Sequence, residues 1–550
     1  MTIRFKGNIN WHRTILLMVL CLFGLGLAYS VKPKRTRPGA KKVDNRVYLN
    51  HADELLYDMY GEHPDAQIAK GKVSFTHKGG VLTCDSAYFY EQSNSFEAFG
   101  HVRFRQGDTL TLTSDYAWYD GDDEMAQVRR NVVLTHRKSK LYCDSLNYDR
   151  MYGVAYFFEG GKLVDKGNTL VSDWGQYNTE TRDAVFYYKV KLKNKQFTMT
   201  SDTLYYDTHT SMSHVVGPSV ITSETSVVHT TDGYYNSNTE RSELYGRSTV
   251  VNGAKTITAD SLYTNDKTKT NEGFGNVVYV DTLNKNRFLG NHIYYEESTG
   301  YGFATDSAVV EDFSQKDTLY VHGDTIKMFS YNLETDSVYR EIHAYNKVRA
   351  YRNDLQAVCD SLVYSSLDSC MTMYKDPIVW NMGRQVLGEV IHAYMADSTM
   401  RYADVIGQAL SVERMDSLHY NQIASKEMQV YFEEGKPRQT WAVGNVLAVY
   451  YPIDDADSTL IGLNYLETDT LKMFLSPNRE LEKIWASKSS GTLYPITQIP
   501  REKMYLPNFA WFDYIRPVDK NDIFLWRGKG KDAVLKEEKR REAPKLKLSN

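Results

Sequence analysis

The sequence predicts an all-β protein, an elongated two-sheet roll or β-solenoid of short antiparallel strands with a period of about 29 residues. Three observations predict this fold class. A Leu-x-Cys/Ser/Ala-Asp motif recurs, a Gly-Asn-Val motif recurs in phase with it, and the composition is rich in Tyr, Thr, Ser and Val but poor in Pro. The aspartates of the first series are Asp85, Asp115, Asp144, Asp173, Asp202, Asp232 and Asp260.

The second motif keeps a constant offset from the first. It is clearest at Gly100-His101-Val102, Arg130-Asn131-Val132, Gly275-Asn276-Val277 and Gly444-Asn445-Val446. Two motifs that keep a constant offset are not explained by chance similarity. The units are therefore genuine repeats. Because each repeat packs only on its neighbours, a chain of 550 residues can form a single array of this kind.

One unit illustrates the elements expected in each repeat. From Gly100, apolar Val102 and Phe104 alternate with Arg103 and Arg105, which predicts a strand. After the turn at residues 106–108, residues 109–114 form a second strand, and residues 117–119 continue on a third. No repeat carries a ten-residue helical pattern, so helical repeat arrays are excluded. Residues 401–415 could form either a helix or a strand.

The N-terminal residues look like a targeting segment. Basic residues precede an apolar run of about fourteen residues at 15–28, and Ala28-Tyr29-Ser30 resembles a cleavage site. The run is shorter than the ~20 residues of a membrane-spanning helix, which favours a cleaved signal peptide over a signal anchor. The basic residues that follow keep the anchor alternative open.

The predicted organisation has six segments. Residues 1–30 are a signal peptide or anchor, 31–46 a basic flexible lead-in, and 47–300 the clear repeats. Residues 301–451 continue the repeats in divergent form. Residues 452–526, rich in Pro and aromatic residues, are a C-terminal cap or docking segment. Residues 527–550 are a charged, disordered tail.

The sequence offers no catalytic constellation and predicts neither an enzyme nor a cofactor or metal. The repeated Asp could bind metal or act as an acid, but it is better explained as a corner residue where one strand bends into the next. Cys84, Cys143 and Cys359 occupy the slot before this Asp and are interpreted as small buried residues. A disulfide between Cys359 and Cys370 stays open. The near-neutral net charge of −4 argues against nucleic acid as a partner.

The remaining candidate site is the apolar stripe that recurs in register on the inward face of the strands. It could be a dry core or a continuous groove that shelters acyl chains, since burial is worth ~0.8 kcal/mol per CH₂. The predicted lipid-lining residues are Val73, Phe75, Val102, Phe104, Leu112, Val132, Leu134, Leu141, Val190 and Leu192.

The two landmarks together resemble the organic-solvent-tolerance (OstA-like) family of lipopolysaccharide transport. The resemblance is clear over residues 48–300 and weaker over 300–450. It implies a V-shaped β-jellyroll that forms a bridge in the periplasm and whose groove carries the acyl chains of lipopolysaccharide. It also implies that modules, including copies of this chain, join end to end by edge-strand pairing. The segment after residue 452 has no counterpart in the family.

Two functional hypotheses follow. The first is a non-enzymatic, periplasmic lipid-binding bridge in lipopolysaccharide transport and outer-membrane assembly, associated with the inner or outer membrane. The second is a structural or adhesive cell-envelope β-solenoid with a dry core. A β-helical polysaccharide-processing enzyme is a weaker third, because it would need acidic residues clustered on a few adjacent rungs.

Overall fold

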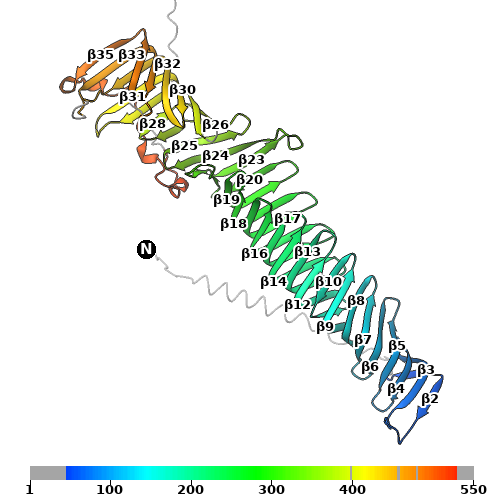
Figure 1. Cartoon of the computed structure of the whole chain (residues 1–550). Coiled ribbons are helices and arrows are strands. Elements are labelled where there is room, and N and C mark those ends of the chain that lie inside the picture. Colours follow the sequence, from blue (N-terminus) through cyan, green and yellow to red (C-terminus); the bar gives the residue numbers. More distant parts are fainter. Residues whose placement is uncertain (1–44, 397–398, 455–458, 479–480, 529–550) are drawn as a thin grey trace, which may run out of the picture.

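The structure is a computed structural model that describes residues 45–396, 399–454, 459–478 and 481–528. Within this part of the chain, 35 antiparallel strands form one continuous sheet, with four short 3₁₀ turns and no α-helix. The strands follow one another along a single long axis (Figure 1). The all-β repeat fold is therefore confirmed. The predicted signal peptide, most of the basic lead-in and most of the charged tail lie outside the described residues.

The first strands are β1 (Tyr48–His51), β2 (Glu54–Tyr57), β3 (Gln67–His77), β4 (Gly80–Tyr90), β5 (Ser95–Gln106), β6 (Leu110–Asp120), β7 (Met125–His136), β8 (Ser139–Asp149), β9 (Val154–Asp165), β10 (Asn168–Ser172), β11 (Trp174–Asn178), β12 (Asp183–Lys193), β13 (Phe197–Asp207), β14 (Met212–Ser223) and β15 (Val227–Asn236).

The array continues with β16 (Arg241–Asn252), β17 (Lys255–Asn265), β18 (Thr270–Asp281), β19 (Asn286–Glu296), β20 (Tyr301–Thr305), β21 (Val309–Asp312), β22 (Leu319–His322), β23 (Thr325–Tyr331), β24 (Tyr339–Arg352), β25 (Leu355–Ser365), β26 (Cys370–Tyr374), β27 (Ile378–Asn381), β28 (Arg384–Leu387) and β29 (Val390–Ala396).

The last elements are β30 (Thr399–Arg414), β31 (Tyr420–Glu433), β32 (Lys436–Tyr450), β33 (Gly462–Leu475), β34 (Leu481–Ser487), β35 (Ser490–Pro495) and the 3₁₀ turns η1 (Ile496–Gln498), η2 (Arg501–Lys503), η3 (Asp513–Ile515) and η4 (Asp522–Phe524). Residues 401–415, whose sequence pattern is compatible with either helix or strand, lie almost entirely in the strand β30.

Most strands of the clear repeats are longer than expected, because each runs through a corner. The two strands expected at 109–114 and 117–119 are one strand, β6, whose pairing with β7 shifts register between Thr113 and Tyr116. A β-bulge of this kind bends a strand without ending it. The change of apolar phase at Asp115 therefore marks a bend, and each repeat consists of two long bent strands.

The bends align from strand to strand and fold the sheet lengthwise into two facing walls. The first wall contains residues 102–106 and 110–114. The second wall contains residues 95–99 and 116–120. Apolar side chains from both walls meet in the interior: the ring of Phe75 in the first wall stacks on Phe96 in the second, with centroids 4.3 Å apart. Alternating positions point outward, as the period of two requires.

The C-terminal residues 496–528, here called the strap, turn back along the outside of the first wall (Figure 1, red). Gln385 on β28 donates its side-chain amide to the carbonyl of Ala510 and accepts the backbone N–H of Phe512, both at 2.8 Å. The outward-facing Trp380 and Leu410 are buried in the same cluster as Phe512. The segment predicted as a cap or docking segment thus begins with β33–β35 and ends on the flank of the roll, while β34 and β35 stay mostly exposed.

Candidate functional site

The corners explain both sequence landmarks. Two consecutive residues there have positive φ, for example Gly100 (73°) and His101 (39°), a conformation that favours Gly and Asn. The repeated Asp of the preceding strand faces this pair: Asp85 Oδ2 lies 2.7 Å from His101 Nδ1. Among the described residues no group of three His, Cys, Asp or Glu could hold a metal ion. The repeated Asp stands at the bend of its strand, and at Asp85 its carboxylate contacts the side chain of the bulge residue on the next strand.

The slot before the Asp lines the inside of the corner. Where it holds Ser, the hydroxyl donates to a carbonyl two residues on, as from Ser114 Oγ to Tyr116 O at 2.9 Å. Cys84, Cys143 and Cys359 fill the same slot as free thiols, and Cys370 is also free. Burial raises the pKa of the Cys84 and Cys143 thiols to about 12. These thiols are protonated at neutral pH and unreactive.

The predicted lipid-lining residues come together in the interior of the first repeats. Nine of them are buried in one cluster, and Phe104 packs against that cluster while remaining partly exposed. The members of the buried set are Val73, Phe75, Val102, Leu112, Val132, Leu134, Leu141, Val190 and Leu192. The walls touch here, and the cavity beside Phe104 measures about 30 Å³. That is room for one or two water molecules, so this part of the interior is a packed core in this structure.

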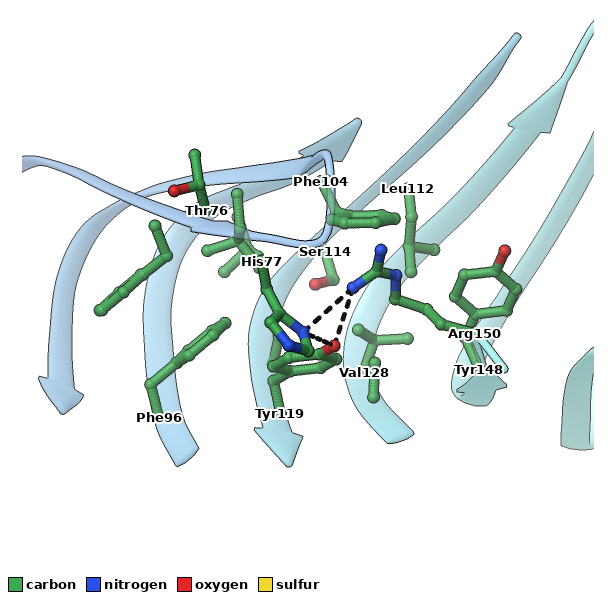
Figure 2. Close-up of a pocket in the computed structure, with 16 residues that line it drawn as sticks. Thr76, His77, Phe96, Phe104, Leu112, Ser114, Tyr119, Val128, Tyr148 and Arg150 are labelled. Atoms are coloured by element: carbon green, nitrogen blue, oxygen red, sulfur yellow. Dashed lines mark hydrogen bonds between the residues drawn. The ribbon is translucent and has the colours of Figure 1, made fainter. Parts of the chain in front are cut away.

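A polar cluster closes this cavity where the free ends of the two walls meet (Figure 2). Arg150, from the turn after β8, donates from Nη1 to the hydroxyl of Tyr119 at 2.8 Å. That hydroxyl lies 2.7 Å from Nδ1 of His77 on the opposite wall. The guanidinium also sits over the ring of Phe104, 5.3 Å from its centroid. All three polar side chains are buried, with Arg150 only 9 % exposed.

Similar contacts join the free ends of the walls farther along. His136 Nδ1 lies 2.8 Å from the Tyr177 hydroxyl, and Tyr206 donates to Asp165 at 3.0 Å. Lys166 donates to the carbonyl of Thr208 at 2.9 Å. Each contact links residues 41 or 42 positions apart, which is the repeat offset between facing wall ends. We call these contacts the latch, and they hold the first repeats shut.

The electrostatics at the two histidine–tyrosine contacts of the latch favour neutral partners. Burial, and then the charge of Arg150, lowers the pKa of His77 below its ordinary value. Burial likewise lowers the pKa of His136 and raises that of the Tyr119 hydroxyl to about 12. At neutral pH both histidines are therefore uncharged and can accept a phenolic hydrogen bond.

The interior changes beyond β15. No side-chain hydrogen bond joins the free ends of the walls within the described residues 241–312. Apolar side chains of the interior register are only partly buried from the end of β14 onward: Ile221, Val228, Val250, Ile257, Tyr279, Leu319, Met328 and Ile342. Sequence reasoning missed these positions. The signal was present, because Val250 and Tyr279 stand two residues after the corner-following Ser248 and Val277, as Phe104 stands after Val102.

Both ends of the array expose strand edges. At the N-terminal end, β1 and β2 pair with the two halves of β3, and the side chains of Leu55, Leu56 and Tyr57 are more than half exposed. At the other end, β34 and β35 pair with the two halves of β33. Edges of this kind are templates for pairing with another strand.

Among the described residues no helix is long and apolar enough to cross a membrane.

The fold and interior define a class of protein, an elongated β-roll with an apolar interior between two walls. Residues 44–202 match the model of a family described as OstA-like protein, which confirms the resemblance seen in the sequence over that part of the chain. No curated protein matches the chain.

Among solved structures, the chain is similar to a protein from Pseudomonas aeruginosa described as LptH, the LptA homologous periplasmic component of the conserved lipopolysaccharide transport device. The identity is 16 %, the match covers 22 % of this chain and 81 % of that one, and the TM-score is 0.19.

Proposed function

We propose that this protein is a non-enzymatic, periplasmic bridge in lipopolysaccharide transport and outer-membrane assembly, and that the space between its walls holds acyl chains. The observation that carries this proposal is the apolar interior register that recurs from strand to strand. Its members run from buried Val102 and Leu134 to the only partly buried Val250, Ile257 and Tyr279. The OstA-like match supports the family context.

The partly buried stretch is the entry point that this proposal favours. Leaving apolar side chains partly exposed costs free energy, at roughly 25 cal/mol per Å² of apolar surface left in water. An acyl chain laid along Val250, Ile257 and Tyr279 would remove that cost. Exchange with the neighbouring modules would use the exposed edges at β1–β2 and β34–β35, by strand addition. Such partners would be other transport components or a second copy of this chain.

One observation favours a second candidate function. The first repeats are packed and latched, as expected for a structural or adhesive cell-envelope β-solenoid with a dry core. The two functions differ in the repeats beyond β15, because a structural solenoid has no need of an interior there that lacks the latch and is only partly buried.

Photo-crosslinking in living cells tests the proposal. A photoreactive amino acid is placed at Ile257, which faces the interior, and in a matched variant at Thr258, which faces outward on the same strand. A second pair uses Phe104 and Arg103. Lipopolysaccharide adducts at Ile257 but not at Thr258 support the transport function. Stable expression with no adduct at Ile257, Phe104 or Tyr279 would favour the structural function instead.

A further inference from the structure

The strongest unexplained feature of the molecule is the charge of Arg150 inside the roll. Its guanidinium is buried, yet within the described part of the chain it forms no ion pair. Its partners are neutral: the Tyr119 hydroxyl, His77 Nδ1, the carbonyl of Lys78 and the side-chain oxygen of Gln106. A buried cation without a carboxylate partner is costly.

Arg349 provides an internal comparison. It is also fully buried, and its guanidinium meets the carboxylate of Asp522 at 3.3 Å. Near Arg150, Lys78 forms an ion pair with Glu124 at 2.5 Å. In this pair the two charges neutralise each other, so Glu124 is not a partner of Arg150. Unlike Arg349, Arg150 therefore has no carboxylate bonded to it among the described residues.

His77 lies beside this guanidinium, with its Nδ1 3.4 Å from Arg150 Nη1. Its Nδ1 faces the phenolic hydroxyl, whereas its Nε2 is buried near the Asn45 backbone and forms no hydrogen bond of good geometry among the described residues. With Nδ1 accepting, the neutral ring carries its proton on Nε2. The bonds of Arg150 to Lys78 and Gln106 are long, at 3.4 and 3.5 Å, so the guanidinium also retains donor capacity.

The remaining wall of the same cavity is apolar. Phe75, Leu82, Phe96, Val102, Leu112 and Val128 line it. Gly80 lets the charge approach this wall: a Cβ at that position would lie 2.6 Å from the Phe104 ring and 3.2 Å from Arg150 Nη2. The closed site thus joins a small apolar cavity of about 30 Å³ to a buried cationic end, a pattern that would match an anionic amphiphile once the latch opens.

We infer that Arg150, together with His77, forms a head-group subsite for a phosphate ester of an amphiphile whose hydrocarbon chains occupy the interior. This inference rests on the proposed function and adds a specific recognition element to it. A phosphate oxygen forms charge-assisted hydrogen bonds to a guanidinium, roughly twice as strong as the neutral bonds to Tyr119 and His77. The anion displaces these neutral acceptors, and the latch at this rung opens as the head group binds.

The test uses the full-length protein and native mass spectrometry to obtain apparent Kd values. The probes are detergent-solubilised diphosphoryl lipid A, the same lipid with its phosphates removed, and phosphatidic acid. The variants are Arg150→Gln, Arg150→Lys, and Arg105→Gln, whose side chain is exposed on the outer face next to Phe104 in the chain. Circular dichroism and thermal unfolding of each variant establish that it is folded.

We expect wild type to bind the phosphorylated lipid about tenfold more tightly than the dephosphorylated one. Arg150→Gln should abolish this preference, whereas Arg150→Lys should retain much of it and Arg105→Gln all of it. A stronger response to lipid A than to phosphatidic acid identifies lipopolysaccharide as the source of the phosphate, and the reverse identifies a phospholipid. Equal binding of the two forms of lipid A, or a preference that survives in Arg150→Gln, overturns the subsite while the transport function stands. Absence of binding to every lipid overturns both.

Discussion

The carboxylate of Asp115 accepts a hydrogen bond from the side-chain amide of Asn131 at 2.7 Å, across two neighbouring strands and sixteen residues of chain. The same contact recurs between Asp260 and Asn276 at 2.9 Å. In each pair the Asp stands at the bend of one strand and the Asn has positive φ at the bend of the next. The two sequence landmarks are therefore the two halves of one structural device, which turns the sheet at the same height in every rung.

Replacing a corner glycine should damage this device. Gly100→Ala introduces a Cβ that would lie within van der Waals overlap of Asp85, in addition to requiring φ of 73°. We expect a loss of roughly 1–3 kcal/mol in local stability. Hydrogen exchange of the β5 and β6 amides measures it. Gly107→Ala is the control, because its φ is also positive but nothing lies near its Cβ. Equal losses in both variants would show that the contact with Asp85 contributes nothing.

The interior should respond differently in its latched and unlatched sections. Leu141 is 1 % exposed, so Leu141→Ala should lower the free energy of unfolding by about 2–5 kcal/mol. Ile257 is only partly buried, and Ile257→Ala should cost less than half as much. Urea unfolding followed by hydrogen exchange separates the two sections. A larger loss for Ile257→Ala would contradict the view that the second section is open.

The latch should loosen in mild acid. Because burial lowers the pKa of His77 in the folded state, the unfolded state binds more protons below pH 6.5, and stability falls as the pH drops through that range. Thermal midpoints measured between pH 7.5 and 5 should fall more steeply for wild type than for His77→Gln. Parallel profiles would show that the pKa of His77 is the same in the folded and unfolded states, so that its burial does not contribute to the pH dependence. The groups facing His77 are Tyr119, Arg150, Lys78, Glu124 and the backbone of Asn45.

The strap should depend on one buried carboxylate. Asp522 meets the fully buried Arg349 at 3.3 Å and also holds Arg527. Asp522→Asn leaves Arg349 uncompensated, and we expect a loss of about 3–5 kcal/mol. Limited proteolysis should then cut the strap faster. Asp513→Asn removes a partly exposed pair with Arg516 and serves as the control. Unchanged proteolysis of Asp522→Asn would show that apolar contacts alone, such as those of Phe512, secure the strap.

Much of the fold is readable from the chain because its signals are local. Each of these signals involves residues within one or two strands: the alternation along β5, the corner motif at Gly100 and the Asp85 series. The structure that each one predicts therefore does not depend on distant contacts. The predicted number of strands per repeat is wrong for a related reason: a change of apolar phase has the same appearance whether a strand ends or bends. Only the continuous pairing of β6 with β7 distinguishes the two.

The sequence by itself determined the repeat, the strand register and the apolar interior, since a period of two and a fixed repeat length place side chains without reference to the rest of the molecule. The tertiary structure alone decided which parts of that interior are shut. His77 and Tyr119 are 42 residues apart, Arg150 reaches them from another turn, and Gln385 holds the strap across 125 residues. These contacts depend on how far the corners bring the two walls together, and no local pattern of residues encodes that distance.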